Sequence, residues 1–366
     1  MKISCLTEVF CPREGAVSES HHLIRVCDPS MSADEQVRCV CEAVASLGGG
    51  KQMFRRFFLK DAASMQPGLE EALRSLPSCP TSIIGQAPLD GTAIAAWVYC
   101  VDGFGDGVSE HGISHNGYSH FWQAQMLSPG GDSHMQMDSI FRSYVSGLSD
   151  HALTLDKDCV RTWIFVRDID SNYGGVVVGR RDVFTEQGLT PQTHFITSTG
   201  IAGSAADAAA LVSMDAYAVG GLDEGQIRFL HAYDHLSPTA LYGVTFERGT
   251  AVQYGDRQQV FISGTASIDS KGEVLHIGDV GRQTVRMLEN IDALLSEAGA
   301  GFRDVRMGLV YLRNPADYET VRGVIAARYP SLPLLYLHAP VCRPTWLVEM
   351  ECIALTPEST DAFPVF

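Results

Sequence analysis

The chain repeats one order of elements, and this repetition limits its possible folds more than any other feature of the sequence. Residues 86–88 (Gln-Ala-Pro) precede an apolar stretch at 93–101. Residues 338–340 (His-Ala-Pro) stand in the same relation to residues 347–352, so the two segments align without a gap. A repeat at this scale indicates that one supersecondary unit has been copied along the chain.

A further copy lies between these two. Residues 160–168 match residues 305–314, and residues 214–219 match residues 350–355. Each copy has the order helix, strand, helix, strand, after a leading pair of strands. We therefore predict three similar units of mixed α and β structure, at residues 1–105, 115–220 and 245–366.

The third unit has the clearest helix and strand signals. Asp279 follows a glycine and is suited to cap a helix that Gly299 ends. Apolar residues recur along this helix at helical spacing: Val285, Leu288, Ile291 and Leu295. Elsewhere we predict a helix at residues 67–76, a Gly- and Ser-rich loop at 103–116 and a linker at 221–244.

The motifs of the third unit stand in the order of a known family. They are Ser263-Gly264-Thr265, Gly278-Asp279 with Gln283, Tyr311-Leu312-Arg313 and Val348-Glu349-Met350-Glu351. This order resembles the reactive-intermediate deaminase (Rid) superfamily, whose YjgF-like fold is also chorismate-mutase-like. The resemblance implies an α+β fold and trimers with sites between neighbouring units. Three units in one chain would then form an internal pseudo-trimer, in which two of the three sites are free to degenerate.

Other residues resemble one branch of this superfamily, the chorismatases. The branch features are Val341-Cys342-Arg343 followed after five residues by Glu349, and the strings Phe246-Glu247-Arg248-Gly249 and Ser263-Gly264-Thr265-Ala266-Ser267. Two departures are visible. Pro340-Val341 stands where the family has an acidic residue before the cysteine, and the first unit resembles no specific member.

Composition narrows the possible ligands and the compartment. A net charge of −16 argues against nucleic acid, which basic patches bind. No apolar run approaches the roughly 20 residues of a membrane helix, and no secretory signal is visible. The ten cysteines have irregular spacing and form no zinc pattern with the histidines, which favours a cytoplasmic protein with reduced thiols. We expect no metal and no organic cofactor.

Glu349 is the strongest catalytic candidate. It lies on an apolar strand where the other two units carry Trp97 and Ser213. Burying an unpaired carboxylate costs several kcal/mol, so burial would raise its pKa and let it hold a proton near neutral pH, as a general acid must. By strand alternation Glu351 lies on the same face. The alternative is that both glutamates face solvent. The resemblance implies that Glu349 is the acid of the chorismatase reaction.

Four other residues of the motifs that resemble chorismatases are candidates for the same site. The resemblance implies that Cys342 belongs to the branch making 3-hydroxybenzoate, although a lone cysteine is also a common buried apolar residue. Arg343 is placed to bind a carboxylate with two hydrogen bonds, or to lie on the surface. Arg248 is a second candidate carboxylate ligand. Gly249 would leave room beside a ring, or simply form a turn.

The remaining candidate substrate-binding residues come mainly from the second unit. Trp163, Tyr173, Arg180, Thr199 and Thr265 occur in segments that look similar to chorismatase sequence. In a ring of three units the second-unit residues would form the neighbouring wall of the site. Taken alone, Arg180 could equally be solvated, and Thr199 could cap or turn the chain.

The resemblance implies an enzyme that cleaves the enolpyruvyl ether of chorismate and releases pyruvate. Gly249 with Cys342 favours 3-hydroxybenzoate as the other product. The alternatives are a Rid-type hydrolase of enamines and imines, or a non-catalytic protein that binds small carboxylates in the same cleft. We expect a small anionic substrate, with neither nucleic acid nor membrane as a partner. The chain is either a monomer containing the pseudo-trimer or a homo-oligomer, including a trimer.

Overall fold

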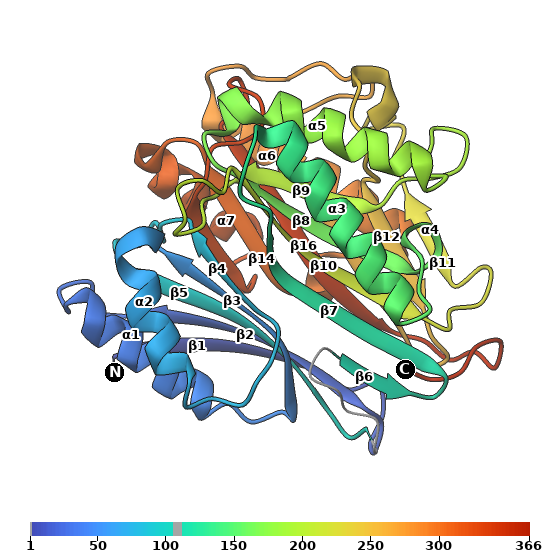
Figure 1. Ribbon diagram of the computed structural model, residues 1–366, viewed down its shortest axis with the longest axis horizontal. Helices are drawn as coiled ribbons and strands as arrows, with labels where there is room; N and C mark the ends of the chain where they lie inside the picture. The colour runs from blue at the N-terminus through green and yellow to red at the C-terminus, as the bar shows by residue number, and fades with distance from the viewer. Residues whose placement is uncertain (1, 105–111) are drawn as a thin grey trace.

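The computed structural model describes residues 2–104 and 112–366 of the chain. Its first sheet has the strand order β1-β2-β5-β3-β4. The strands are β1 (Ile3–Phe10), β2 (Ser18–Val26), β3 (Lys51–Leu59), β4 (Thr81–Gly85) and β5 (Ile94–Asp102). The helices α1 (Ala33–Ala45) and α2 (Ala62–Leu73) cover one face of this sheet (Figure 1). Each helix begins at a side chain that caps its free N–H groups, Ser32 and Asp61.

The second sheet has the same plan, with the strand order β6-β7-β10-β8-β9. Its strands are β6 (Gly112–His115), β7 (Tyr118–Leu127), β8 (Cys159–Val166), β9 (Thr197–Ala202) and β10 (Val212–Gly220). The helices α3 (Ser133–Asp150) and α5 (Ile169–Glu186) pack against each other on its outer face, and the short helix α4 (Leu155–Asp158) precedes β8.

The third sheet adds one strand at its edge and has the order β11-β12-β13-β16-β14-β15. Its strands are β11 (Ile227–Leu230), β12 (Gly249–Gln253), β13 (Arg257–Ala266), β14 (Val305–Leu312), β15 (Leu334–His338) and β16 (Val348–Pro357). Its helices are α6 (Val280–Glu297), which Asp279 caps as predicted, and α7 (Tyr318–Arg328). Three short 3-10 helices complete the chain: η1 (Thr239–Tyr242), η2 (Phe302–Asp304) and η3 (Pro315–Asp317).

The three sheets confirm the prediction of a repeated α+β unit. In each sheet an antiparallel pair leads into a central strand, namely β5, β10 or β16, and the last two strands run parallel. The parallel pair is joined through a helix in every copy, as a parallel connection requires. The strands that the sequence alignment matched, β5, β10 and β16, therefore occupy the same place in their sheets.

The sheets close into a ring, and cyclic backbone hydrogen bonds join their ends. Gly85 N–H donates to Ser204 O at 2.8 Å, linking the first sheet to the second. Ala202 N–H donates to Pro340 O at 3.1 Å, and His338 N–H donates to Ala87 O at 2.8 Å. Each bond begins at the last residue of the parallel edge strand of one sheet and ends two residues beyond that of another. The chain thus builds an internal pseudo-trimer.

A buried ion pair joins each pair of sheets inside the ring. Arg56 pairs with Asp215 across the first and second sheets at 2.7 Å. Arg161 pairs with Glu351 across the second and third at 2.6 Å, and Arg257 pairs with Glu19 across the third and first at 2.9 Å. All six side chains are at most 2% exposed. Removing one partner would leave a buried charge and cost about 3–5 kcal/mol.

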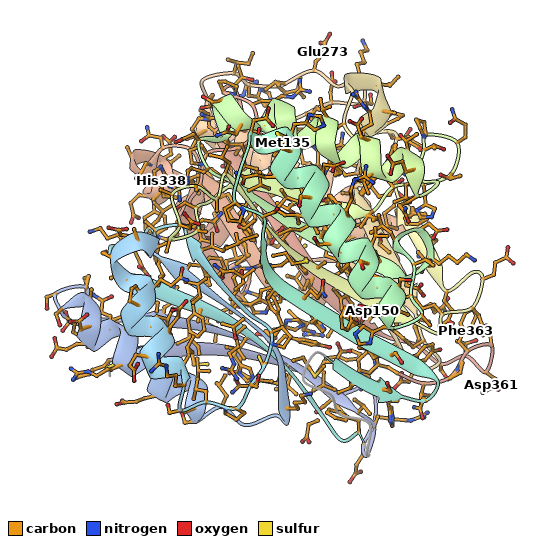
Figure 2. The ribbon with its side chains drawn as sticks, viewed as in Figure 1. Met135, Asp150, Glu273, His338, Asp361 and Phe363 are labelled. Carbon is orange, nitrogen blue, oxygen red and sulfur yellow. The ribbon has the colours of Figure 1, made fainter. Side chains whose placement is uncertain are left out.

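Aromatic side chains fill the rest of the inner space. Trp97, Trp122 and Trp163 lie with ring centroids 6.0 Å apart in two of their pairings. The helices lie outside the ring, so the inner faces of the sheets pack on one another and side chains occupy the space between the ribbons (Figure 2). Sites at the sheet interfaces are therefore shielded from water.

Three predictions about local structure need correction. The 221–244 segment contains β11 and η1, because residues 227–230 pair with β12. Residues 112–115 of the expected 103–116 loop form β6, and residues 105–111 lie outside the described residues. The helix expected at 67–76 spans Ala62–Leu73, because Asp61 caps it five residues earlier and Pro67 lies inside it. No helix in the described part of the chain has the length and apolar character needed to span a membrane.

Candidate active site

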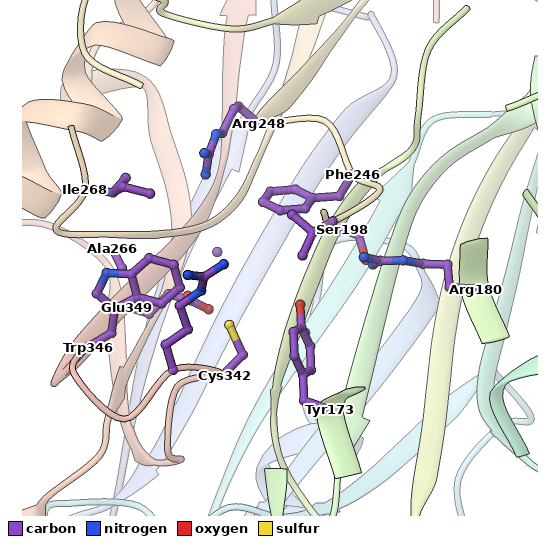
Figure 3. Close-up of a pocket in the computed structure, with 14 residues that line it drawn as sticks. Tyr173, Arg180, Ser198, Phe246, Arg248, Ala266, Ile268, Cys342, Trp346 and Glu349 are labelled. Carbon is purple, nitrogen blue, oxygen red and sulfur yellow. The ribbon is translucent and has the colours of Figure 1, made fainter. Parts of the chain in front are cut away.

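A cavity of about 30 Å³ lies at the interface between the second and third units. Two elements of the second unit, α5 and β9, form one wall. The other walls come from the 244–248 segment, β13, the 341–346 loop and β16 of the third unit (Figure 3). Its lining includes Tyr173, Arg180, Ser198, Val244, Phe246, Arg248, Gly264, Ile268, Cys342, Arg343, Trp346 and Glu349.

Glu349 supplies the acidic group of this cavity. It lies on β16, the central strand of the third sheet, and is 5% exposed. Burial raises the pKa of its carboxyl to about 8, and the negative charge of Glu351 adds to this rise. The positive charges of Arg248 and Arg161 lower the pKa of Glu349, but by less than burial and Glu351 raise it. Glu349 therefore keeps its proton at neutral pH, as a general acid must.

Glu351 lies two residues further along the strand and is held by donors from two sheets. Its carboxylate accepts hydrogen bonds from Arg161 Nη2 at 2.6 Å, Trp163 Nε1 at 3.0 Å and the Tyr311 hydroxyl at 3.1 Å. The Thr199 hydroxyl also donates to it. These bonds hold the Glu351 carboxyl in place behind Glu349, where its charge adds to the raised pKa of Glu349.

Gly264 makes room for the Glu349 carboxyl. A Cβ atom at this position would lie 2.3 Å from Glu349 Oε1 and 3.0 Å from Thr199 Cγ2. The backbone N–H of Gly264 donates to Thr199 Oγ1 at 2.9 Å, which fixes the strand against the second unit. The glycine thus allows β13 and the acid to approach more closely than any side chain would permit.

Three arginines surround the acid. Arg180 on α5 is 2% exposed, and its Nε donates to Thr245 Oγ1 at 3.0 Å. Arg248 is 4% exposed, and its Nη2 donates to Ser237 O at 3.1 Å. The Arg343 guanidinium lies 5.3 Å from the centroid of the Trp346 ring. Because Glu349 is protonated, the cavity carries net positive charge and suits a substrate with carboxylates.

Cys342 faces the cavity as a neutral thiol. Burial raises the pKa of Cys342 to about 12, and the charge of Glu349 contributes to this rise. The hydrogen bond between the Tyr173 hydroxyl and the thiol lowers this pKa, and so does the positive charge of Arg343. Tyr173 points from α5 toward the sulfur (Figure 3). A thiol with this pKa is a weak nucleophile at neutral pH.

The loop that carries Cys342, Arg343 and Trp346 is fixed by Gln283 of α6. Gln283 Nε2 donates to Thr345 O at 2.9 Å, and Gln283 Oε1 accepts from Leu347 N at 2.9 Å. Trp346 Nε1 donates to Ser267 O at 3.2 Å. The motif glutamine noticed in the sequence thus positions the loop that closes one side of the site.

Six of the candidate site residues meet in this cavity. They are Glu349, Cys342, Arg343, Arg248, Tyr173 and Arg180. Two others, Trp163 and Thr199, do not line the cavity. Both donate hydrogen bonds to Glu351, behind the cavity wall. The structure therefore places them among the groups that support the acid.

Two candidates lie off the cavity wall. Gly249 on β12 packs inside the third unit, where an added Cβ would meet Leu230 Cδ1 and Ile262 Cδ1 at 3.1 Å. The glycine that borders the acid is Gly264 instead. Thr265 points away from the cavity between Gly264 and Ala266, and its hydroxyl donates to Ser263 O at 2.9 Å. Strand alternation explains both placements.

Sequence reasoning did not select several residues that line the cavity. Phe246 and Trp346 supply aromatic walls, and Ser198, Gly264 and Ile268 complete the lining. Phe246 and Gly264 were visible inside motif strings, but nothing in the strings separated the residues that face the cavity from their neighbours. Within the described residues no cluster of His, Cys, Asp or Glu has the arrangement of a metal site.

Comparisons with known proteins define the class to which this architecture belongs. Residues 249–356 match the family described as Endoribonuclease L-PSP. A 97-residue stretch is 34% identical to 3-aminoacrylate deaminase RutC of Acinetobacter baylyi and covers 26% of this chain and 77% of that protein. The chain belongs to the YjgF-like superfamily of these proteins. The matched third unit shares its sheet plan with the first two.

Two further relatives place the chain near one branch of this superfamily. A stretch of 216 residues is 31% identical to the 3-hydroxybenzoate synthase of Streptomyces hygroscopicus. This match spans 53% of the chain and less than two thirds, 63%, of that relative. A chorismatase crystal structure superimposes with a TM-score of 0.66 at 20% sequence identity, over 84% of this chain and 94% of its own. The latter likeness establishes the shared fold.

Proposed function

We propose that the protein is a chorismatase-type enzyme that releases pyruvate from chorismate. The observation that carries this proposal is a protonated Glu349 in a buried cavity with Arg180, Arg248 and Arg343 around it. Chorismate has two carboxylates and an enolpyruvyl ether, so it needs both cationic ligands and a proton donor. The similarity to 3-hydroxybenzoate synthase supports the same substrate.

In this mechanism the arginines bind the carboxylates, and Glu349 protonates the methylene carbon of the enolpyruvyl group. The adjacent carbon becomes electron-poor, and the bond between the ring and the ether oxygen breaks. The ether oxygen stays with the three-carbon fragment, which leaves as pyruvate. For 3-hydroxybenzoate, the hydroxyl oxygen on the adjacent ring carbon then moves to the vacated carbon, and loss of one ring proton gives the aromatic ring. Conversion of chorismate to 3-hydroxybenzoate and pyruvate balances without added water, whereas hydrolysis to a dihydroxycyclohexadiene carboxylate consumes one water. Cys342 supports 3-hydroxybenzoate as the product, and Gly249 supports it only through the resemblance.

Substrate entry requires the walls of the cavity to move. A volume of about 30 Å³ accommodates about two water molecules and is too small for chorismate. Arg343 is one of the partly exposed members of the wall, and it lies in the loop between β15 and β16. Movement of this loop would open the cavity while Gln283 holds the loop's far end.

The proposal is tested by incubating the purified protein with chorismate. Pyruvate is measured with lactate dehydrogenase, and the ring product is identified by chromatography against 3-hydroxybenzoate. Pyruvate together with 3-hydroxybenzoate supports the whole proposal. Pyruvate with a non-aromatic product keeps the reaction class and changes the product. Pyruvate at the spontaneous rate rejects the proposal.

The similarity to 3-aminoacrylate deaminase supports a second candidate function. In an imine hydrolase Arg343 would bind the substrate carboxylate and Glu349 would orient water. Ammonia release from a freshly generated 2-aminoacrylate, compared with the uncatalysed rate, tests this candidate. Catalysed ammonia release without pyruvate formation from chorismate would favour it.

A further inference from the structure

The outer strand of the first sheet, β1, has a long free edge. It stands at the end of the strand order and pairs with β2 along all eight of its residues (Figure 1). The outer strands of the other two sheets, β6 and β11, have four residues each. At their other ends the three sheets are joined by the hydrogen bonds that close the ring. A strand edge is a template for pairing with a further strand, and β1 offers the longest of the three.

The backbone groups on the free side of β1 lack partners. Lys2 O accepts from Cys27 N at 2.9 Å, so the even-numbered residues direct their N–H and C=O groups toward β2. Backbone groups alternate between the two sides of a strand, and the odd-numbered residues therefore direct theirs away from the sheet. Across residues 2–104 and 112–366, no hydrogen bond engages the outward N–H and C=O groups of Ile3, Cys5, Thr7 and Val9.

This edge lacks the features that protect most sheet edges. Proteins shorten such strands, interrupt them with bulges, or place lysine or proline in them. Ile3–Phe10 contains neither lysine nor proline, and it pairs with β2 in one continuous register. Two of its apolar side chains, Leu6 and Val9, are 36% and 59% exposed. The edge is therefore open to a strand from another molecule.

The charges at the two ends of β1 make it complementary to a second copy of itself. When two copies run antiparallel with Cys5 on the two-fold axis, Lys2 of each copy lies opposite Glu8 of the other. Lys2 is exposed and has no ion-pair partner in the described part of the chain. Glu8 is partly exposed and lies 3.6 Å from Arg306 Nη1, which is longer than a hydrogen bond. Its carboxylate can therefore pair with a second cation, and opposite charges that face each other across strands stabilise the pairing.

We propose that two molecules form a symmetric dimer through antiparallel pairing of their β1 strands. The two five-stranded first sheets then become one ten-stranded sheet. Cys5 pairs with Cys5, and Ile3 pairs with Thr7 on either side, so each of these residue pairs exchanges two backbone hydrogen bonds. The Cys5 side chains stand out from one face of this sheet and stay accessible. Because β1 belongs to the first unit and the cavity lies between the other two, the inference does not rest on the proposed function.

Sedimentation equilibrium of the purified protein over a range of concentrations measures this association. The mass should rise from that of one chain to that of two, with a Kd on the order of 10 µM. Cys5→Pro should abolish the dimer, because proline lacks the N–H that the pairing uses. The ladder with β2 is kept, since the N–H of this residue points away from β2. Cys5→Ser is the matched control and should dimerise like the wild type.

A charge reversal tests the register without altering the backbone. Lys2→Glu sets like charges opposite each other at both ends of the interface and should weaken the dimer at least about fivefold. Lys60→Glu is the matched control, because Lys60 is exposed but follows β3, and it should leave the Kd unchanged. An unchanged Kd in Lys2→Glu would overturn the pairing. Equal weakening in both variants would also overturn it, since net charge alone would then govern the association.

The oligomeric state itself gives the broadest test. A wild-type protein that stays monomeric at about 100 µM would overturn the inference. A dimer that persists in Cys5→Pro would overturn it as well, because the contact would then lie elsewhere. Thermal unfolding followed by circular dichroism checks that Cys5→Pro is folded, and if it is not, Lys2→Glu decides the question. All of these results are independent of whether the protein cleaves chorismate.

Discussion

Glu349 and Glu351 lie on the same face of β16 but have different surroundings. Glu351 accepts hydrogen bonds from Arg161 at 2.6 Å and from Trp163 at 3.0 Å. Glu349 borders the cavity, and burial raises its pKa to about 8, with the charge of Glu351 adding to the rise. The neighbouring acid therefore helps Glu349 to keep its proton.

Glu351→Gln should lower the pKa of Glu349, because the nearby negative charge is removed. The pH at which activity falls on the alkaline side should then move down by about one unit or more. The measurement is kcat/KM for pyruvate formation between pH 5 and 9. The variant also leaves Arg161 unpaired, at a cost of about 3–5 kcal/mol. An unchanged pH profile in a variant shown to be folded would contradict the role assigned to Glu351.

Glu349→Gln should abolish turnover and spare ligand affinity. General acid catalysis contributes about 10²–10⁴-fold, and an amide of the same shape cannot donate a proton to carbon. The control is Glu273→Gln at an exposed position that does not line the cavity (Figure 2), which should keep wild-type activity. A Glu349→Gln variant that loses affinity and keeps its turnover number would exclude the enzyme mechanism described above.

The same substitution should stabilise the protein, and more so as the pH rises. Glu349 ionises at its ordinary pKa of 4.5 in the unfolded chain and at about 8 in the folded chain. Between these values unfolding releases a proton, so wild-type stability falls as the pH increases through this window. Urea denaturation should show a gain for Glu349→Gln that is small at pH 5 and on the order of 3 kcal/mol at pH 8. A gain that shrinks with rising pH would mean that the carboxyl is ionised when folded.

The repeated fold could be predicted from the sequence because its central strands kept their apolar pattern. Residues 93–101, 214–219 and 350–355 align by sequence and form β5, β10 and β16. The helix that Asp279 begins could also be predicted, since the cap and the apolar stripe are local signals. In contrast, β11 has four residues, flanking turns and only one partner strand. Its place was set by pairing with β12, which local sequence does not encode.

The site could be predicted only in part, for a related reason. Glu349 stood out because a charged residue interrupts an apolar strand, whereas Cys342 and Arg343 were selected through the resemblance. Gly249 and Gly264 looked alike in the sequence, and only the approach of the Glu349 carboxyl from a neighbouring strand distinguishes them. Contacts between units, such as that of Thr199 with Glu351, arise when the ring closes and leave no pattern within either segment.

Cys342 should resist alkylation in the native protein at pH 8. Its pKa of about 12 leaves very little thiolate at that pH. The exposed cysteines Cys5, Cys11 and Cys27 provide an internal control within the same sample. Mass spectrometry after iodoacetamide treatment should find these three modified and Cys342 free. Rapid modification of Cys342, with parallel loss of activity, would instead indicate an activated nucleophile.

Gly264→Ala tests whether the close approach of β13 to the acid matters for catalysis. The new methyl group would lie 2.3 Å from Glu349 Oε1 and 2.8 Å from Glu349 Cδ, so the carboxyl must move. A displacement of about 1 Å at a reacting group costs roughly 10²-fold in rate, and kcat should fall by about that factor. Gly323→Ala on α7 is the matched control, because nothing lies within 4 Å of its added Cβ. That variant should keep full activity and gain up to about 1 kcal/mol of stability. If Gly264→Ala retains wild-type kcat, the carboxyl has room to move, and the position of Glu349 beside Gly264 does not limit the reaction.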